Sequence, residues 1–373
     1  MNIASFGVEE WLNVWENDAI YDIAGSSIAS FSLEEIISID GTTPKEFFDG
    51  LLKTKMNYGW IEGSPAFKKE VSKLYKNVPP ENILQTNGAT GANLLALYSL
   101  IEPGDHVISM HPSYQQLYDI PKSFGAKVDF WEIYEENDWL PKLNELKKLI
   151  RPNTKLICLN NANNPTGTIF DDDFLKEIVE IASNVGAYIL VDEVYKPLDS
   201  SIVVSSIVDL YDKGISTNSL SKTYSVPGIR VGWIASNTEL ADSFRKYRDY
   251  TMICAGVFDD CLAVHILKNK ELVYDRNKKI VHTNLEIVKK WVKNEPRVTL
   301  VFPKYVSTSF IKLDIPIDIE QFCIDILKEK GVLLVPGNRF DVPGHARLGY
   351  CTHTEILKNG LKELSVYLRK FDK

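Results

Sequence analysis

The chain has 373 residues, and its 42 Lys and Arg against 50 Asp and Glu give a formal net charge of -8. A chain of this length is usually too long to fold around a single hydrophobic core, so we expect two or three domains. An acidic surface does not attract a nucleic-acid backbone or an anionic membrane, so we expect neither as a partner.

The N-terminal stretch MNIASFGVEEWLNVWEND is acidic and lacks a basic region followed by an apolar core, so no secretory signal is expected. Apolar stretches such as LLALYSLI at 94–101 are much shorter than the roughly 20 residues that cross a bilayer. We therefore expect a cytoplasmic protein. Five cysteines without CxxC spacing and six histidines without HxxxH spacing predict no metal site.

Apolar, β-rich runs between residues 80 and 240 predict strands of a buried sheet. They lack polar alternation, which indicates burial on both faces and favours a parallel sheet. The stretch at 171–187 predicts a crossover helix, because it begins with acids and places apolar residues on one stripe. Repeated strand–helix–strand units predict an open α/β sheet between two layers of helices, with ligands at the carboxyl ends of its strands. The expected strands are 105–110, 127–133, 155–160, 187–195 and 229–236.

The pattern changes near residue 270, where a long helix around 277–295 is followed by short strands and a helix near 319–330. This order predicts a smaller α+β domain. The first forty or so residues show no strand–helix alternation and are expected to pack against it. The expected division is an N-terminal segment at 1–40, a large domain at 41–270 and a small domain at 271–373.

Two polar stretches follow predicted strands of the large domain. The stretch TNGATGANLLAL at 86–97 opens a helix with small residues, so its backbone N–H groups and the Thr90 hydroxyl can bind an anion. The stretch NNANNPTGT at 160–168 forms a turn that places the Asn164 amide at a strand's carboxyl end. Each stretch taken alone is also typical of a tight turn without a ligand.

Two charged residues lie in stretches that are otherwise strand-like. Asp192, in VDEVY at 191–195, ends a buried run and needs a cation or hydrogen-bond donors, because an unpaired buried charge is costly. Arg347, in GHARLGYC at 344–351, can bind a carboxylate through both arms of its guanidinium. In isolation Arg347 is more typical of a surface strand.

The stretch NSLSKTYSVPGIRVGW at 218–233 places Lys222 between serines and a Pro-Gly-x-Arg group. Together these pieces supply an amine, a phosphate cradle, a carboxylate for a ring nitrogen and an arginine for a substrate carboxylate. Pyridoxal 5'-phosphate (PLP) catalysis on an amino acid requires all of them at once.

From about residue 55 to 351 the chain resembles the fold-type I PLP-dependent enzymes of the class I/II aminotransferase family, in the aspartate aminotransferase superfamily. The family's lysine signature appears as Ser219, Ser221, Lys222, Pro227, Gly228, Arg230 and Gly232. Its N-P-T-G signature appears at 164–167, and its D-E-x-Y signature as Asp192, Glu193 and Tyr195.

The resemblance implies a role for each residue that faces the cofactor ring. Lys222 is expected to bind the PLP aldehyde as a Schiff base and then to act as general base. Asp192 is expected to pair with the ring nitrogen, while Asn164 and Tyr195 reach the phenolic oxygen. Tyr114 matches the aromatic residue that stacks on the ring.

The resemblance also implies how the phosphate and the substrate are held. Tyr58 resembles the tyrosine that family members donate to the phosphate of a neighbouring subunit, which implies a homodimer. Arg347 is expected to hold the substrate α-carboxylate, with Asn164 and Gly25 nearby. The residues expected at the phosphate within one subunit are Ala89, Thr90, Ser219, Ser221 and Arg230.

The segment at 21–35, YDIAGSSIASFSLEE, departs from the family pattern that lines the substrate side-chain pocket. No second arginine can be assigned to a distal substrate carboxylate, although Arg245, Arg248 and Arg276 are candidates by elimination. The expected activity is transfer of an amino group from an L-amino acid to a 2-oxo acid. The alternatives are a β- or γ-eliminating lyase, an amino-acid cyclase, or a non-catalytic sensor with the same fold.

Overall fold

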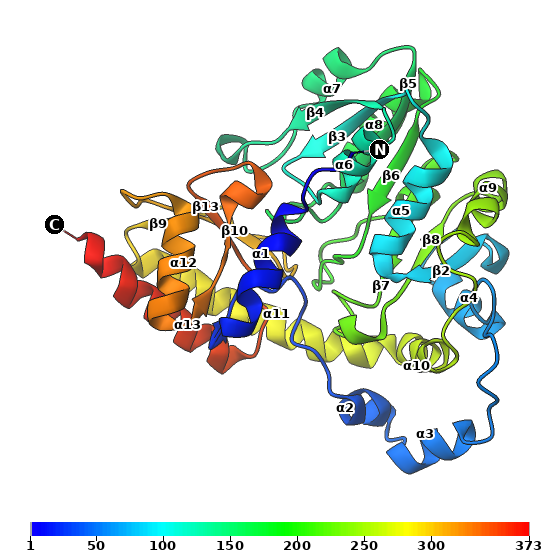
Figure 1. The fold of residues 1–373 in the computed structure, drawn as a ribbon, viewed down its shortest axis with the longest axis horizontal. Coiled ribbons are helices and arrows are strands. Elements are labelled where there is room, and N and C mark those ends of the chain that lie inside the picture. The colour runs from blue at the N-terminus through cyan, green and yellow to red at the C-terminus, as the bar shows by residue number, and fades with distance from the viewer. Residues whose placement is uncertain (1, 373) are drawn as a thin grey trace.

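A computed structural model describes residues 2–372 of the chain. Its centre is a seven-stranded sheet (Figure 1). One strand pairs antiparallel with both of its neighbours, and every other pairing in the sheet is parallel. The expected α/β class with a mostly parallel sheet is therefore confirmed. Across the sheet the strands are β2 (Ile83–Asn87), β8 (Val231–Ala235), β7 (Gly214–Ser219), β6 (Tyr188–Asp192), β5 (Thr154–Asn160), β3 (His106–His111) and β4 (Lys127–Glu132).

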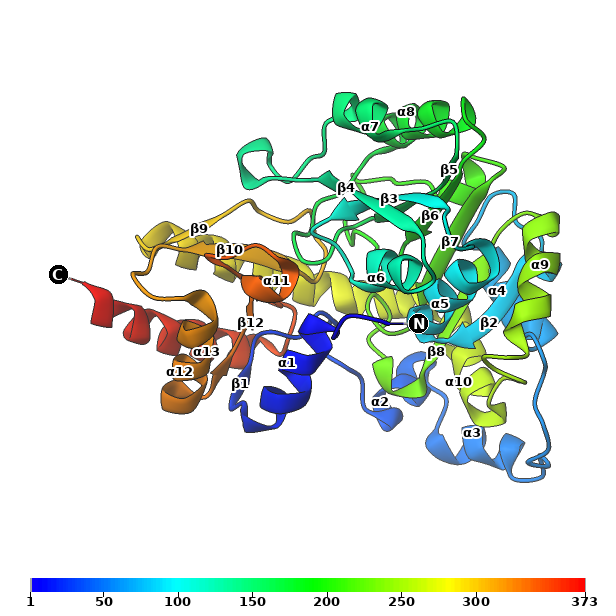
Figure 2. The ribbon, with the colours of Figure 1, turned by 45° about the horizontal axis from the view of Figure 1, so that its top comes forward.

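Helices cover both faces of this sheet, which explains its continuous apolar strands (Figure 2). In β5, Leu156 and Cys158 belong to the core on one face, whereas Ile157 and Leu159 belong to the core on the other. On the first face lie α5 (Gly88–Leu100), α6 (Gln116–Ser123) and α9 (Thr238–Arg248). On the second lie α4 (Pro65–Ser72), α7 (Leu143–Leu149), α8 (Asp172–Ser183) and α10 (Val257–Lys268).

The C-terminal region builds a second, antiparallel sheet of four strands. The long helix α11 (Lys270–Asn294) runs from α10 to this sheet (Figure 1). Across this second sheet the strands are β12 (Val335–Pro336), β13 (His345–Leu348), β10 (Ser309–Leu313) and β9 (Val298–Leu300). The helices α12 (Ile319–Lys330) and α13 (Thr354–Leu368) belong to the same hydrophobic core as these strands.

The N-terminal residues form α1 (Gly7–Trp15), β1 (Tyr21–Asp22), α2 (Leu33–Ile37) and α3 (Pro44–Leu51). β1 pairs in parallel with β11 (Val332–Leu333), and the Trp11 indole on α1 donates to the Leu334 carbonyl at 2.9 Å. α2 packs instead against α10. We retain as a proposal the division at 1–40, 41–270 and 271–373, in which α1 and β1 join the first segment to the small domain.

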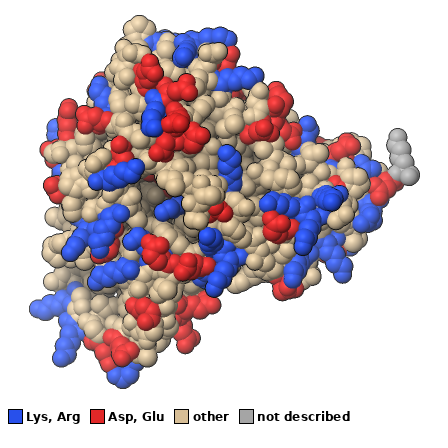
Figure 3. Space-filling model, turned by 180° about the vertical axis from the view of Figure 1, so that it is seen from behind, with Lys and Arg blue, Asp and Glu red and all other residues tan. Residues whose placement is uncertain are grey.

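The surface carries charges of both signs. On the face drawn in Figure 3, Lys and Arg side chains are interspersed with Asp and Glu side chains, and neither sign covers a large continuous area. None of the helices within residues 2–372 is both long enough and apolar enough to cross a membrane.

Candidate active site

A cavity of about 720 Å³ opens at the carboxyl ends of β5, β6 and β7, between the large sheet, α1 and the segment that follows β1. Parallel strands end at a common edge, so polar residues from distant parts of the sequence meet there. Tyr58 does not line the cavity, and the residue is 83% exposed. The other expected site residues all line it: Gly25, Ala89, Thr90, Tyr114, Asn164, Asp192, Tyr195, Ser219, Ser221, Lys222, Arg230 and Arg347.

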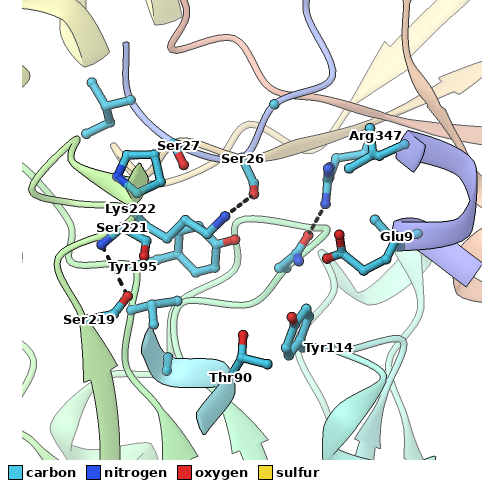
Figure 4. Close-up of a pocket in the computed structure, with 18 of the residues that line it drawn as sticks. Glu9, Ser26, Ser27, Thr90, Tyr114, Tyr195, Ser219, Ser221, Lys222 and Arg347 are labelled. Atoms are coloured by element: carbon cyan, nitrogen blue, oxygen red, sulfur yellow. Dashed lines mark hydrogen bonds between the residues drawn. The ribbon is translucent and has the colours of Figure 1, made fainter. Parts of the chain in front are cut away.

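Lys222 lies just beyond the end of β7, and its half-buried side chain extends into the cavity (Figure 4). Its amine donates a hydrogen bond to the Ser26 hydroxyl at 2.7 Å. Burial, and after it the positive charge of Arg347, lowers the pKa of this amine to about 8. A substantial neutral fraction is therefore present near pH 8, which a nucleophile or general base requires.

Asp192 is the last residue of β6 and is 2% exposed. Its carboxylate accepts hydrogen bonds from the Asn93 amide at 2.8 Å and from the Val194 backbone N–H at 3.2 Å. Burial nevertheless raises the pKa of Asp192 to about 6. No cation among the described residues forms an ion pair with this carboxylate, so it is prepared to receive a cationic group from a ligand.

The start of α5 and the turn before β8 together build an anion cradle. The Arg230 guanidinium donates to the Ser221 hydroxyl at 3.4 Å and to the Pro227 carbonyl at 3.0 Å. Gly88 has φ +66, and a Cβ there would lie 2.6 Å from an Arg230 nitrogen. Glycine therefore lets the guanidinium lie against Gly88, the first residue of α5, at the helix end whose free backbone N–H groups can bind an anion.

Arg347 on β13 is 2% exposed, although it carries a fixed charge. Its guanidinium donates to the Ala24 carbonyl at 3.1 Å and to the Asn164 amide oxygen at 3.3 Å. No ion pair joins Arg347 to an acid among residues 2–372, and burial lowers the pKa of the group. A buried cation with only neutral partners is a receptor for an anion such as a carboxylate.

Aromatic and small residues shape the remaining walls. The rings of Tyr114 and Phe6 lie 5.2 Å apart between centroids, and both residues line the cavity. Burial raises the pKa of the Tyr114 and Tyr195 hydroxyls, so both stay protonated as hydrogen-bond donors. Gly25 donates its backbone N–H to Asp22 at 3.1 Å.

Among the residues that were not predicted from the sequence, Asn93, Ser26 and Glu9 lie next to the predicted functional groups. Asn93 on α5 is buried, donates to Asp192 and accepts from the Thr217 hydroxyl at 2.6 Å. The sequence does contain a signal for Asn93, which is a single amide side chain within an apolar helix. A buried amide needs a hydrogen-bond partner, so its position indicates a polar group nearby. Ser26 and Glu9 have no comparable signal, since both lie in the N-terminal region without a periodic pattern.

The three arginines considered for a distal carboxylate do not line the cavity. Arg245 pairs with Glu62 at 2.7 Å. Arg248 is buried and donates to backbone carbonyls, including that of Gln85 at 3.2 Å. Arg276 donates to the Ala29 carbonyl, and its guanidinium covers the Phe31 ring. Each of the three arginines therefore interacts with groups other than a substrate carboxylate.

Comparisons with known proteins find related enzymes. The sequence profile of the family described as "Aminotransferase class I and II" matches residues 45–363. A solved PLP-dependent aminotransferase from Streptococcus suis is 60% identical, with a TM-score of 0.98 and 100% of both chains covered. An aspartate aminotransferase from Thermotoga maritima is 30% identical over 83% of this chain and 82% of its own. A capreomycidine synthase from Streptomyces vinaceus is 26% identical over 96% of this chain and 92% of its own.

Proposed function

Because this chain belongs to the class I and II aminotransferase family and is a PLP-dependent aminotransferase, we propose that Lys222 is its cofactor-binding lysine and general base. The reaction moves the amino group of an L-amino acid to a 2-oxo acid. The observation that carries the proposal is that the Lys222 amine, the Asp192 carboxylate and the Arg347 guanidinium line one cavity.

The residues present fit PLP at both of its ends. The cradle of Arg230, Ser219, Ser221 and the α5 N-terminus supplies hydrogen-bond donors and positive charge for a phosphate. The buried Asp192 carboxylate fits the protonated ring nitrogen. When bound, PLP supplies an electron-poor ring that accepts the electron pair released when a bond to the substrate Cα breaks.

Lys222 moves the proton at the substrate Cα. Its pKa of about 8 leaves part of the amine neutral at physiological pH. The neutral form accepts the Cα proton, and the resulting ammonium would return it to the cofactor carbon that carried the aldehyde, which is the requirement for amino-group transfer. The Ser26 hydroxyl accepts a hydrogen bond from this amine at 2.7 Å and keeps it directed into the cavity.

Arg347 orients the substrate through its α-carboxylate. An amino acid and a 2-oxo acid both carry a carboxylate beside the reacting carbon, so one guanidinium serves both halves of the reaction. Asn164, which accepts from Arg347 at 3.3 Å, helps to fix the fork of the guanidinium. Holding the carboxylate also favours breaking the Cα–H bond rather than the bond to the carboxylate.

The test is a product analysis with purified protein, PLP, single amino acids and a 2-oxo acid acceptor. Transamination predicts one new 2-oxo acid for each acceptor molecule aminated, without release of ammonia. The alternative of an amino-acid cyclase or eliminating lyase is favoured by one observation, the likeness to a capreomycidine synthase. A cyclic product, or release of ammonia or sulfide without an acceptor, supports that alternative.

We also propose that the active unit is a cytoplasmic homodimer in which Tyr58 reaches the phosphate site of the second copy. The segment that carries Tyr58 is joined to residues 250–255 by a hydrogen bond from the Ala255 N–H to the Trp60 carbonyl at 2.8 Å. A second copy would cover the exposed apolar side chains of this region, which are Leu52, Met56, Tyr58, Trp60, Ile61, Tyr250 and Ile253. Sedimentation should give twice the chain mass, and Tyr58→Phe should weaken PLP binding without dissociating the dimer.

A further inference from the structure

Helix α1 presents one face to the cavity, and that face is acidic. Glu9, Leu12 and Glu16 follow a spacing of three and four residues, which puts them on one side of a helix, and all three line the cavity. The start of α1 is fixed, because the Gly7 N–H donates to the Gln115 side chain at 2.7 Å. Figure 4 shows the Glu9 carboxylate in the space that also contains the Lys222 amine and the Arg347 guanidinium.

The Glu9 carboxylate has no hydrogen-bond or ion-pair partner within the described chain. No hydrogen bond or ion pair joins its carboxylate to another side chain within residues 2–372, whereas the adjacent Glu10 pairs with Arg339 at 3.1 Å. The charge of Glu9 nevertheless acts inside the cavity. After burial and Asp22, it helps to raise the pKa of Glu16, and after burial and Arg347 it opposes the lowered pKa of Lys222.

The cavity's cations are already assigned to other groups. Arg230 lies in the phosphate cradle, Arg347 faces the substrate α-carboxylate, and Lys222 is the reacting amine. The acids Glu9, Glu16 and Asp22 remain around the rest of the space. A second carboxylate on the substrate would be repelled there, because like charges placed next to each other destabilise each other.

The same wall also contains apolar surface. Leu12 lies between Glu9 of α1 and Glu16, which caps the end of that helix, and Ile28 lines the cavity from the segment after β1. A side chain with an apolar stem and a cationic end matches this arrangement, because the methylene groups cover Leu12 and Ile28 while the charge stays near a carboxylate.

We propose that Glu9 is a specificity-determining residue and that the preferred amino-acid substrate has a cationic side chain, as in ornithine, lysine or arginine. This inference rests on the proposed function, since it takes the cavity as the substrate site. It names the side-chain class of the substrate, which the residues around Lys222 leave open.

The experiment compares charged and neutral amino acids of the same shape. Arginine and citrulline differ mainly by the charge of the terminal group, so their ratio of kcat/KM isolates the electrostatic contribution. The proteins are wild type, Glu9→Gln and the matched control Glu10→Gln, whose side chain does not line the cavity. Calorimetric titration with α-methylornithine, which has no Cα–H bond to break, measures binding without turnover.

The expected result is a wild-type preference for arginine over citrulline and over aspartate. Glu9→Gln should reduce the arginine-to-citrulline ratio by about two- to five-fold, the effect of removing one ion pair at an exposed carboxylate. It should weaken α-methylornithine binding by a similar factor, whereas Glu10→Gln should change neither. Equal use of citrulline and arginine, a preference for aspartate, or an unchanged ratio in Glu9→Gln would overturn the inference.

The two proposals fail in different ways. If no amino acid is transaminated but α-methylornithine still binds in a Glu9-dependent manner, the proposed reaction is wrong and the charge preference stands. If citrulline or aspartate is transaminated as well as arginine, the reaction stands and the role of Glu9 is wrong.

Discussion

Replacing Asn93 by leucine tests how the large domain holds Asp192 in its charged form. The Asn93 amide donates to Asp192 at 2.8 Å and is itself oriented by the Thr217 hydroxyl at 2.6 Å. Leucine has nearly the same size but cannot donate. The substitution therefore removes one hydrogen bond from a buried carboxylate.

A hydrogen bond to a charged group contributes about 1.5–3 kcal/mol. Since one pKa unit corresponds to about 1.4 kcal/mol, the pKa of Asp192 should rise by about one to two units from its value near 6. At neutral pH the residue would then be largely protonated and could not pair with a cationic ring nitrogen. We expect the dissociation constant of PLP to increase on the order of 10–100-fold.

The assay is an equilibrium titration of the apoprotein with PLP, followed by absorbance at pH 6, 7, 8 and 9. A group whose pKa has been raised is ionised only at higher pH, so the defect of Asn93→Leu should shrink as pH increases. In an Asp192→Asn background the same substitution should add little, because Asn93 acts through Asp192. Wild-type affinity in Asn93→Leu, or a defect that is constant with pH, would refute this reasoning.

Three further substitutions or conditions test other parts of the site. Arg347→Gln should raise KM for the amino acid on the order of 10–100-fold while the cofactor absorbance is kept, and an unchanged KM would contradict the carboxylate role. Gly88→Ala places a Cβ 2.6 Å from an Arg230 nitrogen at φ +66, so PLP should be lost on dilution, whereas Gly228→Ala, where an added Cβ meets nothing within 4 Å, should retain it. The rate of PLP capture by the apoprotein should rise with pH through about 8, because the neutral Lys222 amine is the reactive form, and a midpoint near the ordinary lysine value would contradict the lowered pKa.

The sheet and the residues at its edge could be predicted because their signals are local. Asn164 and Asp192 each follow a continuous apolar run, and parallel strands bring the ends of such runs together. The direction of β8 could not be predicted in the same way. Its run at 229–236 is apolar in either orientation, and β8 proved antiparallel to both neighbours.

The residues that escaped prediction depend on distant partners. Asn93 meets Asp192 across 99 positions of the sequence, and Ser26 meets Lys222 across 196. Their hydrogen bonds exist only after the helices and the N-terminal segment have packed. Glu9 required knowing that α1 lies over the cavity, which no periodicity in the first forty residues indicates.

The most direct measurement is to reduce the PLP-loaded protein with borohydride, digest it and locate the label by mass spectrometry. Reduction converts a linkage between the cofactor and a lysine into a stable secondary amine. We predict a single pyridoxyl phosphate on the peptide that contains Lys222, and none in Lys222→Ala. Labelling of a different lysine, or equal labelling in Lys222→Ala, would contradict the assignment of Lys222 as the cofactor-binding residue.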